Sequence, residues 1–188
     1  MTTPLYRRVL GERFDRLPPT VRALHDVERP STWHGEADVE RGTTLIARLV
    51  GWIARLPPTS RALPLVVTFT PDGSGEQWRR SFGRHVFPTY QSAGDGVILE
   101  RIGPTTVALK PAAGPDGLTL SVAGLSVFGI PMPAAIWPAV TTREHEVDGR
   151  YHFEVEGVLP LAGRLVHYRG WLEPADGAAE PVTSASRT

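Results

Sequence analysis

The sequence contains no cysteine, and Lys110 is its only lysine among 20 basic side chains. The missing cysteines exclude disulfide bonds, thiolate nucleophiles and cysteine-ligated zinc or iron–sulfur centres. Lys plus Arg and Asp plus Glu each number 20, so the formal net charge is zero. A chain without net charge has no overall field that would attract DNA, RNA or anionic lipid. We therefore expect no nucleic-acid partner.

Signature motifs are also missing. There is no P-loop, no Gly-x-Gly-x-x-Gly, no His-Glu-x-x-His and no Gly-x-Ser-x-Gly, and these strings mark nucleotide, zinc and serine-hydrolase chemistry. The six histidines do not have zinc-ligand spacing. We therefore expect no cofactor and no metal. Basic residues stand beside aromatic ones around Trp78, a composition that can bind single-stranded nucleic acid, but the zero net charge argues against that use.

The sequence also shows no secretory signal and no convincing membrane-spanning segment. Residues 1–15 contain no apolar run typical of a secretory signal. Residues 117–142 carry no charge and are long enough to span a bilayer. Glycines and prolines interrupt this segment, however, and its first half alternates like a strand, so we expect a buried strand followed by an apolar loop. Together with the lack of cysteine, this predicts a cytoplasmic protein without a membrane span.

Helices are predicted only in the first third of the chain. Apolar residues recur at helical spacing after Pro4 and again after Thr20, and prolines end both segments. A third helix is predicted at 43–56, ended by Pro57, with a broad apolar stripe that includes Trp52. Because such a stripe is normally buried, we expect this helix to pack on the concave face of a sheet.

The rest of the chain is predicted to form strands separated by Gly, Pro and Asp turns. Short connections favour antiparallel pairing, and a sheet of about ten strands normally curls or closes. The sequence therefore predicts an α+β, mainly antiparallel β fold, in which a curved sheet closes to a barrel or half-barrel like a lipocalin or START-type cup. One domain is expected at 1–174, with N-terminal helices at 1–30, the sheet at 31–174 and a disordered tail at 175–188. The predicted strands are 32–41, 65–70, 76–82, 84–90, 96–102, 105–110, 117–128, 140–146, 150–158 and 164–172.

The hairpin around Asp148-Gly149 allows two registers. A two-residue turn would put Glu144 and Glu146 on the same face as Tyr151, which is costly for bare carboxylates. A three-residue loop instead pairs Glu146 with Arg150, so opposite charges meet on a solvent-facing side. We therefore predict the three-residue loop.

This register decides which residues are candidates for a site. It places Arg143 and His145 on the apolar face, together with Tyr151 and Phe153. These two polar side chains either reach water at a rim or point into a cavity and orient a ligand. His167, Arg169 and Trp171 share one face of the last strand and raise the same question. The candidate ligand-binding residues are Arg143, Tyr151, Phe153, Arg169, Trp171, Tyr90 and Trp52.

Several short strings along the chain form a recognisable set: Pro4-Leu5-Tyr6, Leu17-Pro18, Trp33-His34-Gly35, Arg41-Gly42, Leu56-Pro57-Pro58, Phe82-Gly83, Gly129-Ile130-Pro131-Met132-Pro133, Asp148-Gly149-Arg150 and Tyr168-Arg169-Gly170-Trp171-Leu172. Through these strings the chain resembles, over residues 4–174, a bacterial family, the domain of unknown function 4166. The resemblance implies a module that works beside small-molecule metabolism, because relatives are often fused to Rossmann-type dehydrogenase or epimerase-like domains. It supplies no catalytic residues.

Three functions follow as hypotheses. The first is binding of a lipophilic small molecule in an apolar cup. The second is a cofactor-free enzyme of the cyclase or isomerase type, with His145 or His167 as general acid or base and Tyr90, Tyr151 or Tyr168 as a donor. In the third, the chain is the non-catalytic partner of a separate oxidoreductase, on which the apolar loop at 129–140 would dock.

Overall fold

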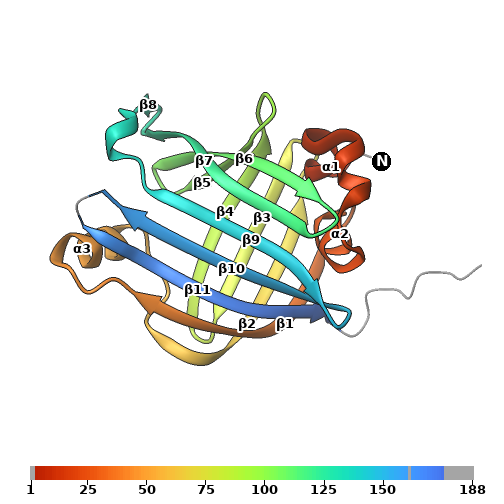
Figure 1. The fold of residues 1–188 in the computed structure, drawn as a ribbon, viewed down its shortest axis with the longest axis horizontal. Helices are drawn as coiled ribbons and strands as arrows, with labels where there is room; N and C mark the ends of the chain where they lie inside the picture. Colours follow the sequence, from red (N-terminus) through yellow and green to blue (C-terminus); the bar gives the residue numbers. More distant parts are fainter. Residues whose placement is uncertain (1–2, 161, 176–188) are drawn as a thin grey trace, which may run out of the picture.

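The structure is a computed structural model, and it describes residues 3–160 and 162–175. Apart from Ala175, the tail predicted at 175–188 lies outside these residues. The described residues form two short α-helices and a 3-10 helix, followed by strands and one further α-helix (Figure 1). In chain order the elements are α1 Leu5–Leu10, η1 Gly11–Arg16, α2 Pro19–His25, β1 Ser31–Arg41, α3 Leu45–Ile53, β2 Ser60–Pro71, β3 Gly75–Phe82, β4 His85–Ala93, β5 Ile98–Ile102, β6 Thr105–Gly114, β7 Gly117–Val127, β8 Ile130–Pro131, η2 Ala134–Ile136, β9 Ala139–Val147, β10 Arg150–Leu159 and β11 Gly163–Pro174.

Ten of the strands close into a barrel. The sheet order is β6-β5-β4-β3-β2-β1-β11-β10-β9-β7-β8, and an additional pairing between β6 and β7 joins its two ends. All of these pairings are antiparallel, and the two-residue β8 is attached to β7 outside the closed ring. Closure leaves the ten strands without a free edge. The predicted barrel, and the strands predicted for it, are confirmed.

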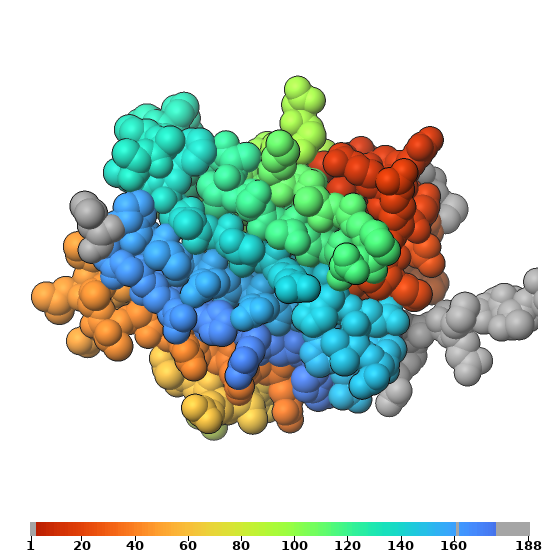
Figure 2. Space-filling view, in the orientation of Figure 1, coloured from red at the N-terminus to blue at the C-terminus, as the bar shows by residue number. Residues whose placement is uncertain are grey.

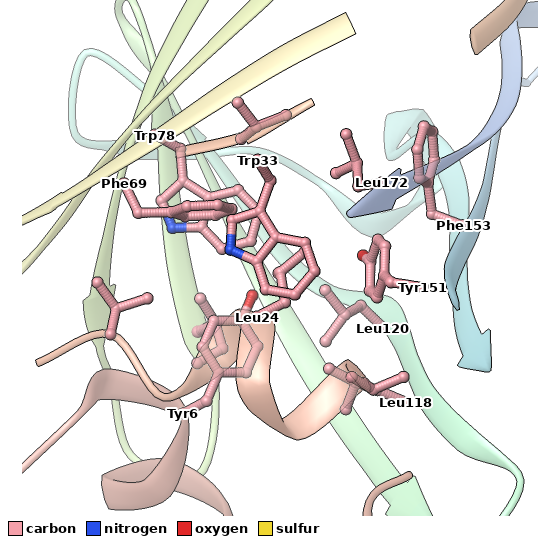
Figure 3. Close-up of a cluster of buried hydrophobic side chains, with 14 of the residues drawn as sticks. Tyr6, Leu24, Trp33, Phe69, Trp78, Leu118, Leu120, Tyr151, Phe153 and Leu172 are labelled. Atoms are coloured by element: carbon pink, nitrogen blue, oxygen red, sulfur yellow. The ribbon is translucent and has the colours of Figure 1, made fainter. Parts of the chain in front are cut away.

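Alternate side chains of each strand fill the barrel interior, as the pleat requires. Phe69, Trp78 and Leu120 come from three different strands and belong to one cluster of buried side chains (Figure 3). Trp78 packs edge-on against Phe69, with ring centroids 4.6 Å apart. The barrel therefore has an apolar interior.

The two N-terminal α-helices cap one end of the barrel (Figure 1). Tyr6 and Phe14 are completely buried, and Leu24 is almost so. In Figure 1, α1 and α2 lie at one end of the barrel, whereas α3 and β8 lie at the other. The barrel thus has one end closed by helices and an opposite end formed by α3 and the segment 128–138.

The third helix does not pack as predicted. It starts at a capping Thr44, whose hydroxyl accepts a hydrogen bond from the Ala47 backbone N–H at 3.2 Å. It rests on the ends of β11 and β1 through its small residues, Ala47 and Gly51, which are buried. Its large apolar side chains are exposed instead. The expectation of a stripe buried on a concave sheet face is wrong, because the barrel closes on itself and the helix is left at its open end.

The predicted register of the last hairpin is also wrong. Val147 pairs with Arg150, which leaves a two-residue turn of Asp148 and Gly149. Both turn residues have positive φ, 50° and 72°, as a type I′ turn requires, and its twist matches that of the flanking strands. Glu144 and Glu146 therefore face inward, on the same side as Tyr151.

The carboxylates tolerate this position because they are not bare. His25 of α2 lies 2.5 Å from Glu144, and Thr20 donates both its backbone N–H and its hydroxyl to Glu146, at 2.8 and 2.9 Å. Their partners come from more than a hundred residues away in the sequence. The hairpin sequence alone therefore could not reveal that these carboxylates have partners.

Candidate functional site

The barrel contains a cavity of about 650 Å³. It extends from Tyr6 and Leu24 at the capped end to Val50 of α3 and Phe128 at the opposite end. Ile53, Phe128 and Ile136 line the cavity and are also strongly exposed, so the cavity reaches the surface between α3 and the segment 128–138. We call this opening the mouth.

Most of the cavity wall is aliphatic or aromatic. The wall includes side chains from every strand of the closed barrel except β1. Its apolar residues are Leu65, Val67, Phe69, Trp78, Phe82, Phe87, Ile102, Val107, Leu109, Leu120, Leu125, Val127, Val140, Phe153, Val155, Leu159, Leu165, Val166 and Leu172.

A connected group of polar side chains interrupts this wall, and we call it the interior polar cluster: Tyr6, Arg80, Thr89, Gln91 and Glu100. The Arg80 guanidinium donates to Thr89 Oγ1 at 2.8 Å and to Glu100 Oε1 at 3.2 Å. The Thr89 hydroxyl and the Gln91 amide also donate to Glu100 Oε1, at 2.8 and 3.3 Å. Tyr6 then donates its hydroxyl to Gln91 Oε1 at 3.0 Å. One ion pair and its hydrogen-bond partners thus form a polar spot in an apolar cavity.

Burial and opposite charge act against each other on Arg80. Burial by itself lowers the pKa of the guanidinium, but the neighbouring Glu100 carboxylate, together with Tyr168 and Tyr6, outweighs it and the pKa is raised. The guanidinium also lies 4.7 Å from the centroid of the Trp78 ring, a cation–π arrangement. Arg80 is therefore charged and held in place beneath the cavity surface.

Tyr168 also lines the cavity. Burial raises the pKa of its hydroxyl to about 12, against a smaller lowering by Arg80. A phenol with this pKa keeps its proton at neutral pH. Tyr168 is therefore a hydrogen-bond donor facing the cavity.

A second buried polar group lies next to the capping helices. Glu144 lines the cavity and pairs with the completely buried His25. The His25 ring also stacks on Tyr6, with centroids 3.8 Å apart. Burial, and then the charge of Glu144, raise the pKa values of Tyr6 and Tyr151 well above the usual value. Both phenols therefore stay protonated at neutral pH.

The structure brings two of the predicted site residues into the cavity, Tyr151 and Phe153. Tyr168, predicted as a donor, also lies there. Trp52 and Tyr90 do not line it: Trp52 projects from α3 and is 76% exposed, and the Tyr90 hydroxyl lies on the outside, 3.1 Å from Asp72.

The polar candidates of the last strands lie on the outer surface. The two-residue turn shifts β9 by one residue relative to the predicted pairing, which reverses the faces of Arg143 and His145. His145, Arg169 and Trp171 line a shallow outer depression of about 370 Å³. His167 also faces outward, and its Nε2 lies 2.8 Å from the exposed Glu154. Of the two alternatives for these polar groups, the water-facing one therefore applies and the interior one does not.

The interior polar cluster was missed in the sequence. Arg80 and Glu100 stand at positions whose neighbours two residues away are large and apolar, Trp78 and Phe82 for Arg80 and Ile98 and Ile102 for Glu100. Since alternate residues of a strand share a face, this pattern places one charge of each sign among inward-facing side chains. The alternation is the signal that could have found them.

Residues 3–160 and 162–175 contain no group of three or more His, Cys, Asp or Glu side chains placed to hold a metal ion. None of the helices described there is both long and apolar enough to cross a membrane.

Fold and cavity together define the class: a closed antiparallel β-barrel with an internal, mainly apolar cavity that opens at one end. The sequence matches, over residues 17–172, the family described as Domain of unknown function (DUF4166). Since this match covers most of the chain, the chain belongs to that family, as its resemblance predicted. No curated protein matches the chain.

Proposed function

We propose that the protein binds a lipophilic small molecule inside the barrel. The observation that carries this proposal is the cavity of about 650 Å³, whose wall is mostly aliphatic and aromatic. Its size lies within the range of about 300–1,000 Å³ typical of small-molecule sites, and few polar groups in an apolar wall are the usual composition of such sites. Binding would bury apolar ligand surface at roughly 25 cal/mol per Å².

The polar groups favour a ligand with a neutral polar end. Arg80 is already paired with Glu100, so it has no unmatched positive charge to offer a carboxylate. Glu144 also lines the cavity and is paired with His25, so neither pair leaves a free cation for an anionic ligand, and a buried anion without a cationic partner would be strongly disfavoured. The protonated Tyr168 hydroxyl can donate to an alcohol or carbonyl oxygen. A long-chain alcohol or ketone fits these groups better than a fatty acid.

The cavity is tested with N-phenyl-1-naphthylamine, a neutral probe whose fluorescence rises in apolar surroundings. Val155 lines the cavity and is only partly buried, so Val155→Trp should fill the space without replacing a core residue. Val66→Trp is the matched control, because Val66 is 40% exposed on the outside of β2. We expect the wild type and Val66→Trp to bind the probe and Val155→Trp to lose binding about tenfold or more. Equal binding by both variants would show that the probe sits elsewhere.

The preference for a ligand with a neutral polar end is tested by displacement of the same probe. We expect 1-dodecanol to displace it at a concentration at least about tenfold below dodecanoate, since ionised carboxylates are costly to bury. Tyr168→Phe should weaken dodecanol by about fivefold to tenfold, the usual net value of one hydrogen bond, and leave probe binding unchanged. Tighter binding of dodecanoate would contradict the neutral-end proposal.

The other hypotheses remain predictions of the sequence. The two histidines predicted as acid or base, His145 and His167, lie outside the cavity, so a catalytic role would need other groups. An oxidoreductase partner and a cytoplasmic location likewise stay as predictions.

A further inference from the structure

We propose that the mouth of the barrel docks on the surface of an anionic lipid bilayer, with α3 and the segment 128–136 immersed in the headgroup region. The surface that would dock is a ring of large apolar side chains, which we call the apolar collar. Its members are Leu45, Ile46, Leu49, Trp52, Ile53, Phe128, Ile130 and Ile136, each between 54% and 82% exposed.

The apolar collar gathers nearly all the large apolar side chains that the protein exposes. Of the ten such side chains exposed among residues 3–160 and 162–175, eight belong to the collar, and only Val66 and Val147 lie elsewhere. The two segments that carry the collar protrude together at one end of the molecule (Figure 2). Scattered exposed apolar residues are normal, but a concentration like this one marks a contact surface.

The charged residues at the two ends of the barrel favour an anionic lipid bilayer as the partner of the apolar collar. At the mouth end, the connections between strands carry Arg48, Arg55 and Arg84 and no acidic residue. These connections are 42–59, 83–84, 103–104, 128–138 and 160–162. Glu40 and Glu156, which lie near this end, both pair with Arg164. Each arginine near an anionic leaflet contributes about 1 kcal/mol of attraction.

The opposite end has the reverse charge in its hairpin turns. The turns 72–74, 94–97, 115–116 and 148–149 each contain one aspartate and no Lys or Arg. The capping segment 3–30 beside them carries six arginines and four acidic side chains, so it offsets two of the four aspartates. The mouth connections thus carry three arginines without an acidic residue, whereas the opposite end has an excess of two acidic side chains. This difference would turn the apolar collar toward an anionic surface.

The form of the apolar collar favours a bilayer over a protein partner. The large side chains of α3 point outward from a helix that rests on its small residues, and an apolar helix face with an arginine and a tryptophan is typical of interfacial helices. Ile53, Phe128 and Ile136 belong to both the collar and the cavity wall. A lipophile could therefore move between bilayer and cavity without crossing open water.

Vesicle flotation of the full chain tests the docking. We use vesicles of phosphatidylcholine with about 30% phosphatidylglycerol and vesicles of pure phosphatidylcholine. The wild type should float with the anionic vesicles, and Leu49→Glu/Phe128→Glu should weaken binding about tenfold or more, because two charges would enter the interface. The matched control is Val147→Glu, since Val147 is 42% exposed at the opposite end; it should bind like the wild type. Arg48→Gln/Arg55→Gln should weaken binding to anionic vesicles more than to neutral ones.

Three results would overturn the proposal. One is absence of flotation with both kinds of vesicle. Another is binding that survives Leu49→Glu/Phe128→Glu but is lost in Val147→Glu. The third is a wild-type dimer in sedimentation velocity that the collar variant turns into a monomer while vesicles bind neither, which would assign the collar to a second copy of the chain. Circular dichroism of every variant verifies folding.

The docking concerns the outer surface and stands apart from ligand binding. Val155→Trp fills the cavity but leaves the apolar collar intact, so it should float like the wild type. If the wild type floats but takes up no N-phenyl-1-naphthylamine, the docking holds and the proposed function fails. If the wild type binds the probe but does not float with vesicles, the proposed function holds and the docking fails.

Discussion

Three carboxylates inside the barrel, Glu76, Glu100 and Glu144, each lie against a donor from another part of the chain. Glu76 accepts from the Leu5 backbone N–H at 3.3 Å and from the Trp78 indole at 3.1 Å, and burial still raises its pKa. Glu100 has the Arg80 guanidinium, and Glu144 has the His25 ring. The barrel interior tolerates these three carboxyl groups because each one has a hydrogen-bond or ion-pair partner.

Breaking the pair of His25 and Glu144 should be costly. His25→Phe keeps an aromatic ring against Tyr6 but leaves Glu144 buried without its partner. We expect a loss of about 3–5 kcal/mol in the free energy of unfolding, as for other buried pairs that lose one member. Urea unfolding measures it. The double variant His25→Phe/Glu144→Leu should recover part of this loss. If the losses of His25→Phe and Glu144→Leu simply add in the double variant, the pair is not coupled.

Asp72 gives a test in acid. The backbone N–H of Gly75 and the hydroxyls of Ser74 and Tyr90 hold the pKa of its carboxyl at about 2, below the ordinary 3.8. A folded-state pKa below the unfolded one stabilises the fold above about pH 4, and the effect is lost as pH falls toward 2. Asp72→Asn should therefore lower the thermal midpoint at pH 6, with the difference shrinking from pH 4 to pH 2. A difference that is the same at both pH values would contradict this account.

At the scale of elements, the β9–β10 hairpin determines which residues face the cavity. Its turn requires positive φ at Asp148 and Gly149, and a shift of one residue would exchange the inner and outer faces of β9. The type I′ turn is thus the local cause of Glu144 facing the cavity and His145 facing outward.

Glycine at 149 should matter for its backbone conformation alone. A Cβ there would meet no atom within 4 Å, but φ is +72°, a region that costs other residues about 1–2 kcal/mol. Gly149→Ala should lower the free energy of unfolding by about that amount in chemical denaturation. Gly114→Ala is the control, since its Cβ also meets nothing within 4 Å and its φ is not positive; it should be close to neutral. Equal effects of the two variants would rule out strain at the turn.

At the scale of the whole molecule, the closed ring of strands has two ends that differ in structure. The first strand pairs with the last over nine residues from Trp33 to Arg41, and β6 pairs with β7 to complete the ring. Helices cap one end, and the cavity opens at the other end, which carries the apolar collar and the arginines. The molecule therefore has one end by which a ligand could enter.

Ligand binding should appear as global stability. At a free concentration ten times its dissociation constant, N-phenyl-1-naphthylamine should add about 1.4 kcal/mol to the free energy of unfolding by mass action. For a domain of this size that corresponds to a rise of about 3–6 °C in the thermal midpoint. Differential scanning calorimetry measures the shift. Val155→Trp should show none, and a shift of the same size in that variant would place the probe outside the cavity.

Much of the fold could be predicted from local patterns. Alternation gave the strands, prolines and turn residues gave their ends, and short connections gave antiparallel pairing and closure. The site could not be predicted in the same way. Arg80 and Glu100 are 20 residues apart in the sequence, and only the register across β3, β4 and β5 places them in contact.

The amino-acid sequence by itself determined the family, the barrel and the absence of cysteine chemistry, because these depend on composition and on patterns a few residues long. Tertiary structure decided the rest: the hairpin register, the side of the wall on which each polar group lies, and the exposure of α3. The reason is physical. The free energy of a buried charge depends on its partner, and the partners here, such as His25 for Glu144, become neighbours only when the barrel closes.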